Sequence, residues 1–464
     1  MKIFSYTLEP KHQKISIFLT ILFFLAWKFT SLTFRFGDSN AYFYMADQFS
    51  KGILPYRDYF LADPPVMIMF LGSLKLFIGK NIILLQAVPF LLEVASAGLL
   101  YLILKKEKNP LAFLAPLFYL FSFSVLATSD FLTGVQLVNL FSLSAFYFYQ
   151  KTRLKTSGFF WGLAILTKLY ALFLLLGFLF FLLSQKKFRA IFSLCLGAVF
   201  AALLFLFPFL ILAPQETFDY LILHHFNRPG GGNRSAVFFF FFQKEWLLLL
   251  LAIAGLVHSK KWSLGLPLAT FFVFLLFFQD LYYTYFAALL PFSILLAIIF
   301  LASIFESPRF SKFFSALVFL YLLFLLLGTG SYQENHLPFG QFSNAQEIAN
   351  YLSTQEKRPL YGSHEVAPLI ALLSRNNLLE NYIDTNPQTF GSGANNKEGI
   401  SQQVLEKNAY LIARIARRPE YGPGDIGTEG YFSENLFRTN CHELKTFPSP
   451  SKEWDNLIII YVCS

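Results

Sequence analysis

The chain has 464 residues, of which 55% are hydrophobic, 19% aromatic and only 14% charged. An ordinary soluble enzyme carries about a quarter charged residues, so this composition excludes one, and its high apolar content also excludes intrinsic disorder. The formal net charge is +9, but the basic residues lie between long apolar runs, where they indicate membrane orientation and do not predict nucleic-acid binding. The composition predicts a polytopic membrane protein.

Apolar runs recur from the N-terminal region to residue 328. A spanning helix needs about 20 apolar residues, because about 30 Å of hydrocarbon is crossed at about 1.5 Å per residue. We expect membrane helices near residues 15–33, 81–104, 110–127, 134–150, 189–213, 236–257, 263–279, 283–305 and 312–328. Two further stretches, 64–79 and 157–184, are ambiguous by length alone.

The basic connectors between these runs resolve the two ambiguous stretches. Short loops rich in Lys and Arg prefer the cytoplasm. All basic connectors fall on that side only if 64–79 does not cross and 157–184 crosses twice, as two short helices meeting near Thr167 and Lys168. The prediction is an all-α protein of the inner membrane with about 11 transmembrane helices, a cytoplasmic N-terminus and an extracytoplasmic C-terminus. The first run lacks a small-residue cleavage pattern, so we expect an uncleaved anchor.

The composition changes sharply after residue 328, where Asn, Gln, Glu, Pro and Gly become frequent. We expect a transmembrane module over 1–328, including an outer loop at 34–80, and a small soluble α/β domain outside the cytoplasm over 329–464. In that domain the pattern predicts a strand at 359–364, a helix at 366–374 and a buried strand at 457–462.

The same domain contains two of the three cysteines, Cys441 and Cys463. They either pair as a disulfide in an oxidising compartment or remain two buried thiols.

The first outer loop places polar side chains next to the membrane. Asp38 comes just beyond the first apolar run, where a carboxylate is partly desolvated yet reachable by a substrate. It is either a catalytic base or the cap of a short helix that begins near Asn40. Further along, Pro64 and Pro65 open a segment typical of an interfacial helix.

In chain order, this loop contains Gly37-Asp38, Tyr42, Ala46, Gly52, Pro55-Tyr56-Arg57-Asp58, Pro64-Pro65 and Phe77-Ile78-Gly79. The order resembles the first loop of the GT-C membrane glycosyltransferases, of the protein mannosyltransferase and aminoarabinose transferase type. Leu166-Thr167-Lys168-Leu169 resembles the family's Leu-Thr-Lys-Gly, with Leu169 in place of the usual Gly. The segment from Tyr282 to Pro291 resembles its late aromatic-to-proline segment, so the resemblance covers roughly residues 15 to 330.

The resemblance implies transfer of a sugar, with inversion, from a polyprenyl-phosphate donor to an envelope glycan, lipid or protein acceptor on the outer face of the membrane. Asp38 matches the catalytic acidic position, which implies a general base. Some relatives have Asp-Glu where this chain has Asp38-Ser39, so Asp63 and Asp130 are candidates for the second acid. Asp130 matches a second acidic site of some relatives; it either orients the acceptor or helps to hold a cation, or it lies at a helix end facing solvent.

Candidate phosphate ligands lie in two places. Lys168 has apolar neighbours in the sequence, so it either stabilises the leaving lipid phosphate or extends to the membrane interface. His224, His225 and Arg228 lie in the middle outer loop and are the other candidates. The adjacent histidines are poor evidence for a metal without a third ligand, and a surface pair is the simpler interpretation.

Two residues of the first loop complete the predicted substrate site. Tyr56 suits stacking on a sugar, although tyrosines are also enriched at membrane interfaces. Arg57 either binds the phosphate region of the donor or pairs with Asp58. These residues identify no cofactor with certainty, and a divalent metal ion stays an open alternative.

The rival function is a secondary transporter or lipid flippase of the cell envelope. Transporters place polar groups near the bilayer midplane in two repeated halves. Here the carboxylates gather in the predicted outer loops and no repeated halves are visible, which favours the glycosyltransferase.

Overall fold

The computed structural model describes residues 9–79, 81–230, 233–306, 311–335, 344–416, 428, 430–448 and 456–464. The chain divides into two compact units. The helical unit comprises Met1–Ser31, Ala87–Phe205 and Gly230–Leu337, and the loop-and-tail unit comprises Leu32–Gln86, Leu206–Pro229 and Pro338–Ser464. The first loop, the middle loop and the tail, which lie far apart in the sequence, therefore fold together.

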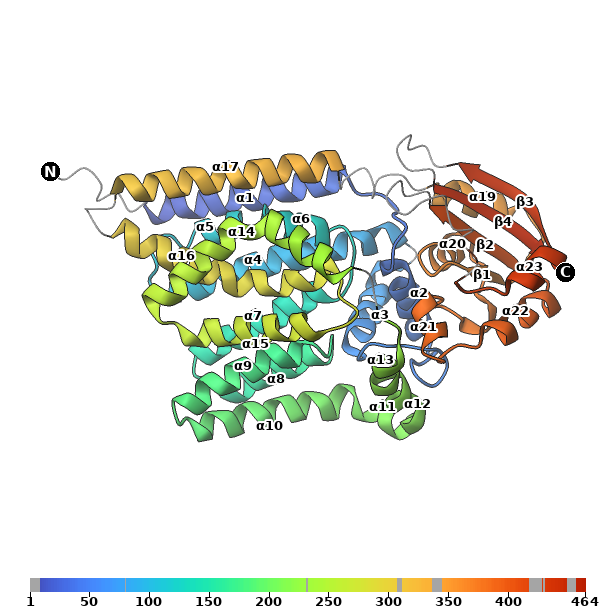
Figure 1. Ribbon diagram of the computed structural model, residues 1–464, viewed down its shortest axis with the longest axis horizontal. Helices are drawn as coiled ribbons and strands as arrows, with labels where there is room; N and C mark the ends of the chain where they lie inside the picture. The colour runs from blue at the N-terminus through green and yellow to red at the C-terminus, as the bar shows by residue number, and fades with distance from the viewer. Residues whose placement is uncertain are drawn as a thin grey trace. The chain divides into compact units, whose positions relative to one another are not determined.

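The helical unit consists of apolar helices, and the axes of most of them lie roughly along one line of the picture in Figure 1. They are α1 (Pro10–Thr30), α4 (Val88–Lys106), α5 (Leu114–Leu120), α6 (Phe123–Thr128), α7 (Val135–Gln150), α8 (Leu154–Ile165), α9 (Ala171–Ser184), α10 (Phe188–Phe205), α14 (Arg234–Ser259), α15 (Trp262–Phe277), the 3₁₀ turn η3 (Tyr283–Leu289), α16 (Leu290–Phe305) and α17 (Ser311–Asn335). The turn η1 (Ile82–Ala87) leads into α4.

Six stretches of the described residues are long and apolar enough to cross a membrane, judged by length and composition. They are Lys11–Thr30, Ile82–Lys106, Phe188–Phe205, Arg234–Ser259, Tyr283–Phe305 and Phe313–Glu334. Shorter apolar helices include α9 and α15. The chain is therefore an integral multi-pass membrane protein, and the total of about 11 crossings remains a prediction.

Two of the predicted spans show how local sequence shapes these helices. The run at 110–127 is divided into α5 and α6, because Ser122 adopts an extended backbone and its hydroxyl accepts a hydrogen bond from the amide of Val125, which caps α6. The stretch 157–184 forms two helices, α8 and α9, on either side of residues 166–170. This is the arrangement that the basic connectors predict.

Small residues allow neighbouring helices to pack closely. Helix α8 packs on α10, and a Cβ atom at Gly158 would collide with the backbone of Leu194. Gly197 of α10 meets the carbonyl of Lys155 in the same way. Such contacts are typical of helix association inside membranes.

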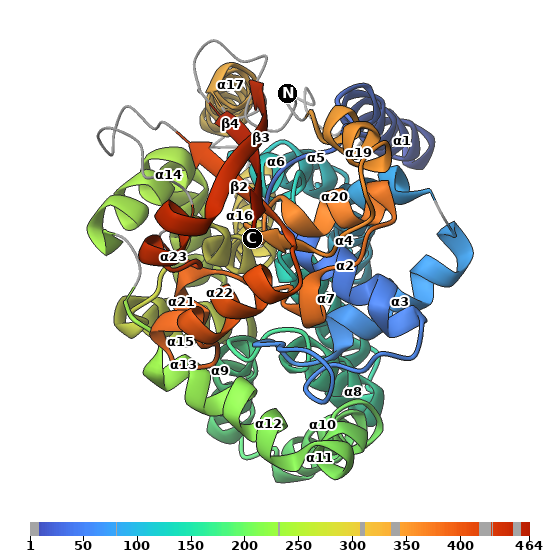
Figure 2. The same ribbon diagram turned by 90° about the vertical axis from the view of Figure 1, so that its right-hand side faces the viewer.

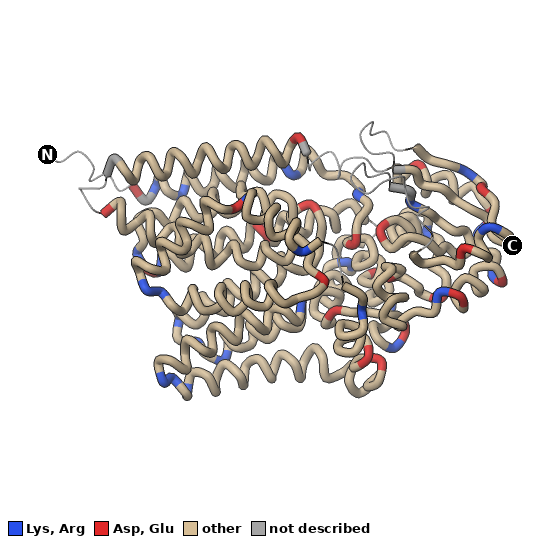
Figure 3. Tube along the Cα trace, in the orientation of Figure 1, with Lys and Arg blue, Asp and Glu red and all other residues tan. Residues whose placement is uncertain are grey.

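The basic connectors of the helical unit lie at one end of its helices. Figure 3 shows Lys and Arg at the connections α9–α10 and α14–α15, which lie at the same end. This distribution is the one that the preference of Lys and Arg for the cytoplasmic side predicts.

The loop-and-tail unit contains short helices and one sheet. Its helices are α2 (Ser39–Ser50), α3 (Val66–Ile78), α11 (Phe207–Leu212), α12 (Pro214–Phe218), the π turn η2 (Asp219–Leu223), α13 (His224–Asn227), α19 (Ala345–Ser353), α20 (Ala367–Ser374), the 3₁₀ turn η5 (Leu379–Asn381), α21 (Pro387–Gly391), α22 (Lys397–Glu406) and α23 (Glu434–Asn440). Its strands are β1 (Leu360–Gly362), β2 (Tyr410–Ala416), β3 (Cys441–Pro448) and β4 (Asn456–Cys463).

Helix α3 is the ambiguous stretch of the first outer loop. Its 13 residues span about 20 Å. It packs on α2 with Leu71 fully buried, while Leu76 and Phe77 are 70% and 88% exposed. This helix belongs to the loop-and-tail unit, as expected of an interfacial helix that does not cross.

The sheet has the order β1-β2-β4-β3, with β1 parallel to β2 and the other pairs antiparallel. One face buries a cluster that includes Tyr361, Leu411 and Val404 of α22. Figure 2 shows α19 and α20 on the opposite side of the sheet from α22 and α23. The predicted strand at 359–364, helix at 366–374 and strand at 457–462 are confirmed as β1, α20 and β4.

A disulfide joins Cys441 to Cys463 across the paired strands β3 and β4. Of the two alternatives that the sequence leaves open, the structure forms the disulfide.

Candidate functional site

Asp38 meets a histidine of the tail. It lies at the start of α2, but its side chain makes no capping hydrogen bond there, so the capping alternative does not describe its contacts. Instead, Oδ1 of Asp38 lies 3.1 Å from Nε2 of His364. The carboxylate side chain is 60% exposed and the imidazole 14% exposed. An accessible acid is thus backed by a more buried partner.

His364 occupies the short connection between β1 and α20. The amide of Ser363 donates to the carbonyl of Ile412 on β2 over 3.2 Å, which fixes this connection to the sheet. The next residue, Glu365, forms an ion pair with Arg414, also on β2. The carbonyl of Glu365 accepts a 2.7 Å hydrogen bond from the side chain of Asn40 on α2.

The charges around His364 favour its protonated form. Burial alone would lower the pKa of His364, but the hydrogen bond and charge of Asp38, followed by the charges of Glu365 and Asp384, outweigh burial and raise the pKa to about 9. The pKa of Asp384 is raised by burial and partly restored by the positive charge of His364. At neutral pH, Asp38 and His364 therefore form an ion pair.

Asp63 is held by two tyrosines. The hydroxyl of Tyr42 donates to Oδ2 of Asp63 over 2.9 Å, and the hydroxyl of Tyr56 donates to its backbone carbonyl over 2.7 Å. Burial, with the charges of Asp63, Asp38 and Asp384, raises the pKa of Tyr42 well above its usual value, so Tyr42 remains a neutral donor. Because Asp63 and Asp38 both raise the pKa of Tyr42, the two carboxylates lie in the same electrostatic environment.

Tyr56 and Arg57 have structural partners. Tyr56 is 1% exposed and adopts a positive φ of 67°, and its ring packs edge-on against Phe209. This burial leaves no ring face for a sugar and favours a supporting role. Arg57 forms a bidentate pair with Asp58 over 2.9 and 2.7 Å, which is the pairing alternative predicted for it.

The middle loop contributes the two adjacent histidines. Nδ1 of His224 lies 2.8 Å from Oγ of Ser392, and Nε2 of His225 lies 2.9 Å from the carbonyl of Ala62, next to Asp63. His224 is 5% exposed, so the surface-pair interpretation is wrong for it. Burial, with the charges of His225 and Arg228, lowers the pKa of His224 to about 4, so His224 is neutral at physiological pH. It therefore brings no charge to a phosphate.

A divalent cation has one candidate donor set among the described residues. Asp38, His364 and Glu365 each offer one donor atom, and these atoms lie within 4.8 Å of one another. In the structure, His364 and Arg414 already neutralise the two carboxylates. The arrangement is that of two adjacent ion pairs.

The two remaining predicted residues, Asp130 and Lys168, belong to the helical unit. Oδ1 of Asp130 lies 3.0 Å from the ammonium of Lys28, and its Oδ2 accepts a 2.6 Å hydrogen bond from Tyr332. Only 1% of the Asp130 side chain is exposed, so it does not face solvent. Lys168 is 9% exposed, and its amide continues the turn of α8 by donating to the carbonyl of Ala164.

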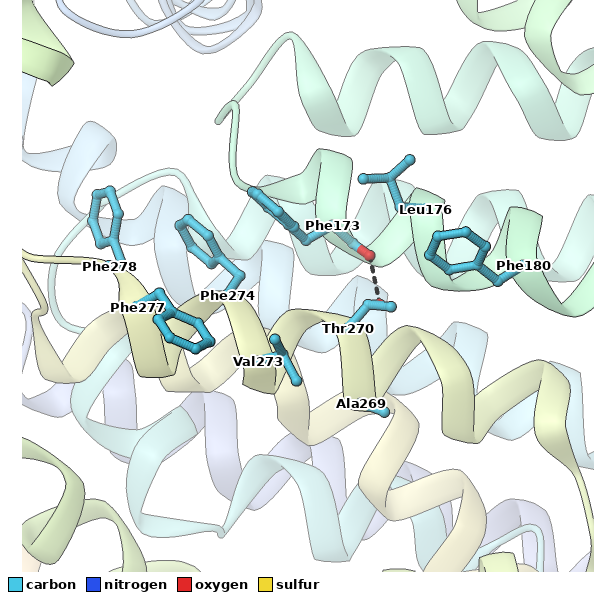
Figure 4. A pocket seen from close by; sticks show the side chains of 9 residues that line it. All are labelled: Phe173, Leu176, Phe180, Ala269, Thr270, Val273, Phe274, Phe277 and Phe278. Atoms are coloured by element: carbon cyan, nitrogen blue, oxygen red, sulfur yellow. Dashed lines mark hydrogen bonds between the residues drawn. The ribbon is translucent and has the colours of Figure 1, made fainter.

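An apolar groove lies between α9 and α15 in the helical unit (Figure 4). Its volume is about 510 Å³. The lining residues are Phe173, Leu176, Phe180, Ala269, Thr270, Val273, Phe274, Phe277 and Phe278. The hydroxyl of Thr270 donates a 2.7 Å hydrogen bond to the carbonyl of Phe173. Because the other lining side chains are apolar, this groove suits a hydrocarbon chain.

The residues absent from the sequence prediction are mainly those of the tail. His364 is the last residue of the predicted strand at 359–364 and Glu365 follows it, so a polar pair at the end of a strand is the signal that the sequence offers. Asp384 carries no local signal. Lys28 stands within an apolar run, and its need for a carboxylate partner was the signal for the pair with Asp130.

No protein-family model matches the chain, and no curated protein matches its sequence. Several solved chains match its fold, among them two structures of ArnT. The crystal structure of ArnT from Cupriavidus metallidurans bound to undecaprenyl phosphate superposes with a TM-score of 0.63 at 14% identity, covering 96% of this chain and 97% of that chain. The apo state of ArnT gives a TM-score of 0.60 at 14% identity, covering 95% and 97%.

This likeness extends over almost the whole of both chains. It shows that the protein has an ArnT-like polytopic fold with a small C-terminal sheet, and it confirms the fold that the first-loop resemblance predicts.

Proposed function

We propose that the protein is a membrane glycosyltransferase that transfers a sugar from a polyprenyl-phosphate donor to an acceptor on the outer face of the membrane, with inversion. The observation that carries the proposal is the accessible carboxylate of Asp38, which follows the first apolar helix in a fold shared with ArnT. ArnT has been solved with undecaprenyl phosphate, which supports a donor of the same chemical class here.

In this reaction Asp38 is the general base. The acceptor oxygen attacks the anomeric carbon, the bond from that carbon to the phosphate oxygen breaks, and the phosphate leaves with the electron pair. The proton of the acceptor passes to the carboxylate of Asp38. A positioned base of this kind contributes about 10²- to 10⁴-fold to the rate.

Cations of the chain stabilise the leaving phosphate. A positive charge placed where negative charge develops lowers the barrier without a proton donor. We assign this role to Lys168, which is 9% exposed. Arg228 and His225 of the middle loop are the other candidate phosphate ligands. His224 is neutral and bonded to Ser392, so its role is to position that loop.

The other predicted residues orient the site. Asp63 receives the hydrogen bond of Tyr42 and is the candidate for a carboxylate that contacts the sugar or the acceptor. Tyr56 fixes the backbone of Asp63, and Arg57 is held by Asp58. Asp130 is buried against Lys28 and Tyr332, which supports a structural role beside the substrate role that the sequence resemblance implies.

The apolar groove between α9 and α15 is the candidate site for the polyprenyl chain. Its lining is almost entirely hydrocarbon, and the polar Thr270 hydroxyl is already bonded. A donor confined to the bilayer and a polar acceptor meet at the interface, which supplies part of the catalytic geometry.

The disulfide supports an extracytoplasmic tail, because disulfides persist in oxidising compartments. The basic connectors at one end of the helical unit support the same topology, with a cytoplasmic N-terminus in the inner membrane.

One observation favours the rival function of a transporter or flippase. Glu93 and Glu245 are fully buried in the helical unit, and each has one carboxylate oxygen without a hydrogen-bond partner among the described residues. Acidic side chains inside membranes often mark ion or substrate pathways.

A glycan analysis in cells tests the proposed function and identifies the sugar. A deletion strain is complemented with the wild type, Asp38→Asn or, as a control, Glu347→Gln on the exposed face of α19. Mass spectrometry of the envelope glycans, lipids and proteins is expected to show one sugar that is restored by the wild type and Glu347→Gln but not by Asp38→Asn. Restoration by Asp38→Asn, expressed at equal level, would contradict the proposed mechanism.

A further inference from the structure

We infer that His364 of the tail is a positioning residue for Asp38, so that the soluble tail completes the catalytic site. This inference rests on the proposed role of Asp38 as the base. Nε2 of His364 lies 3.1 Å from Oδ1 of Asp38, and the two residues are 326 positions apart in the sequence. The contact lies within the loop-and-tail unit, which contains both segments.

The difference in exposure assigns the two roles. Asp38 has 60% of its side chain exposed, whereas His364 has 14%. An acceptor arriving from solvent therefore meets the carboxylate first, and the imidazole supports the carboxylate from behind. In the Ser-His-Asp triad a buried aspartate orients the histidine that takes the proton. Here the roles are reversed, because the more buried histidine orients the aspartate that takes the proton.

The backbone around His364 is rigidly held. The amides of Val366 and Ala367 donate to the carbonyl of Ser363 over 2.9 and 2.8 Å, closing a turn that is attached to β2 through Ser363 itself. Val366 is fully buried beneath this turn. The imidazole is thus presented by the sheet, which is a more precise support than a long loop.

Two further contacts tie the helix that follows Asp38 to the tail. The side chain of Asn40 donates 2.7 Å hydrogen bonds to the carbonyls of Arg35 and Glu365. The hydroxyl of Tyr44 accepts a 3.0 Å hydrogen bond from the amide of Leu378. Together with the Asp38 contact, these hydrogen bonds join the start of α2 to the tail at Asp38, Asn40 and Tyr44, so the orientation of Asp38 depends on the folded tail.

Charge gives His364 a second effect on the base. The acidic groups that face it are Asp38, Glu365 and Asp384, and Glu365 is paired with Arg414. Carboxylates brought together disfavour one another's charged forms. A protonated His364 offsets this repulsion, so that the ion pair holds the Asp38 carboxylate in place.

The test compares His364→Gln with His364→Lys in the full-length protein reconstituted in lipid nanodiscs. Glutamine keeps a donor without the charge, and lysine keeps the charge. The control is His442→Gln, the same substitution at an exposed position of β3 in the same domain. The assay measures release of polyprenyl phosphate from the donor that the glycan analysis identifies, with kcat and KM determined separately between pH 6 and pH 10.

The expected result is a fall in kcat of about 10- to 100-fold for His364→Gln, within the range attributed to positioned acid–base groups. The donor KM should change by less than about 3-fold, because a positioning residue that acts through Asp38 affects the proton transfer and not donor binding. His364→Lys should recover much of kcat. The wild type should lose activity as pH rises through about 9, where His364 loses its proton. This loss should move to higher pH in His364→Lys and disappear in His364→Gln.

A double variant keeps the inference falsifiable if His364→Gln lowers stability. If His364 acts through Asp38, adding His364→Gln to Asp38→Asn should leave the residual rate unchanged, since residues that act as a unit are not additive. If the double variant has the melting temperature of Asp38→Asn but a lower residual rate, the inference is wrong.

Two other outcomes overturn it. If His364→Gln keeps the kcat and pH profile of the wild type while Asp38→Asn is inactive, His364 has no role in positioning the base. The proposed function is then left intact. A second outcome concerns metal: EDTA abolishes wild-type activity, and zinc or manganese restores it. If neither His364→Gln nor Glu365→Gln shows this recovery, the two residues hold a metal ion and the ion-pair inference is wrong. An active Asp38→Asn would instead reject the proposed function itself.

Discussion

The ammonium of Lys28 and the carboxylate of Asp130 lie 3.0 Å apart inside the helical unit, with 2% and 1% of their side chains exposed. Tyr332 accepts a 2.7 Å hydrogen bond from Lys28 and donates one of 2.6 Å to Asp130. This triad joins α1, the connection between α6 and α7, and α17. Each charge is satisfied inside an apolar surrounding, where an unpaired charge is costly.

Lys28→Met should lower the free energy of unfolding by about 3–5 kcal/mol, because Asp130 is left as an uncompensated buried charge. The double variant Lys28→Met/Asp130→Leu should recover most of this loss. Thermal unfolding in detergent, followed by tryptophan fluorescence, measures both. If the double variant is stable but no longer releases polyprenyl phosphate, Asp130 has the substrate role that the sequence resemblance implies.

The disulfide should form in the mature protein and stabilise the tail. Replacing Cys441 and Cys463 by serine should cost about 2–4 kcal/mol of unfolding free energy, as is usual for a native disulfide. Alkylation before and after reduction, followed by mass spectrometry, counts the free thiols. Cys195 should be the cysteine that reacts without reduction. Alkylation of all three without reductant would place the tail in a reducing compartment and contradict the proposed topology.

The Asp38–His364 pair should also make stability depend on pH. The pKa of His364 rises from 6.5 to about 9 on folding, so the stabilisation is fully present below pH 6.5 and is lost as the pH rises through about 9. The gain should be only about 1 kcal/mol, because solvent screens the exposed Asp38. The difference in melting temperature between pH 6 and pH 10 should therefore be smaller in His364→Gln than in the wild type and in His442→Gln. Equal differences in all three proteins would contradict the pair.

Filling the apolar groove should weaken binding of long donors. Ala269→Trp on α15 places an indole in the groove and should raise KM about 10-fold for an undecaprenyl donor. A donor with a two-isoprene tail should be affected much less, because little of it enters the groove. Val257→Trp, at a 70% exposed position of α14, is the matched control. Equal effects of Ala269→Trp on both donors would locate the polyprenyl chain elsewhere.

Local sequence patterns predict much of the fold. Apolar run lengths and basic connectors predict the short helix α3, the α8–α9 pair and the membrane character. Short apolar runs in the polar tail predict β1 and β4. These patterns do not predict the break between α5 and α6, because it depends on the cap formed by one serine, Ser122. Run length alone does not detect such a cap.

The candidate site is less predictable, because its contacts join distant segments. The sequence marks Asp38 through its position after an apolar run, but nothing local indicates that its partner is His364 on another segment. The same limitation applies to His224, whose burial depends on Ser392 of the tail. Tyr56 and Arg57 have the right chemistry for a substrate site. Tyr56 is buried, however, and Arg57 is paired with the neighbouring Asp58.

The most direct test of the central claim is a single-turnover assay with purified protein in nanodiscs. Radiolabelled polyprenyl-phosphate sugars, one hexosyl and one pentosyl, are supplied with acceptors extracted from the deletion strain. The wild type should transfer label from one of these donors and release polyprenyl phosphate, and Asp38→Asn should be slower by at least about 10²-fold while keeping the wild-type melting temperature. Transfer at the wild-type rate by Asp38→Asn, or movement of intact donor across the membrane without transfer, would contradict the account.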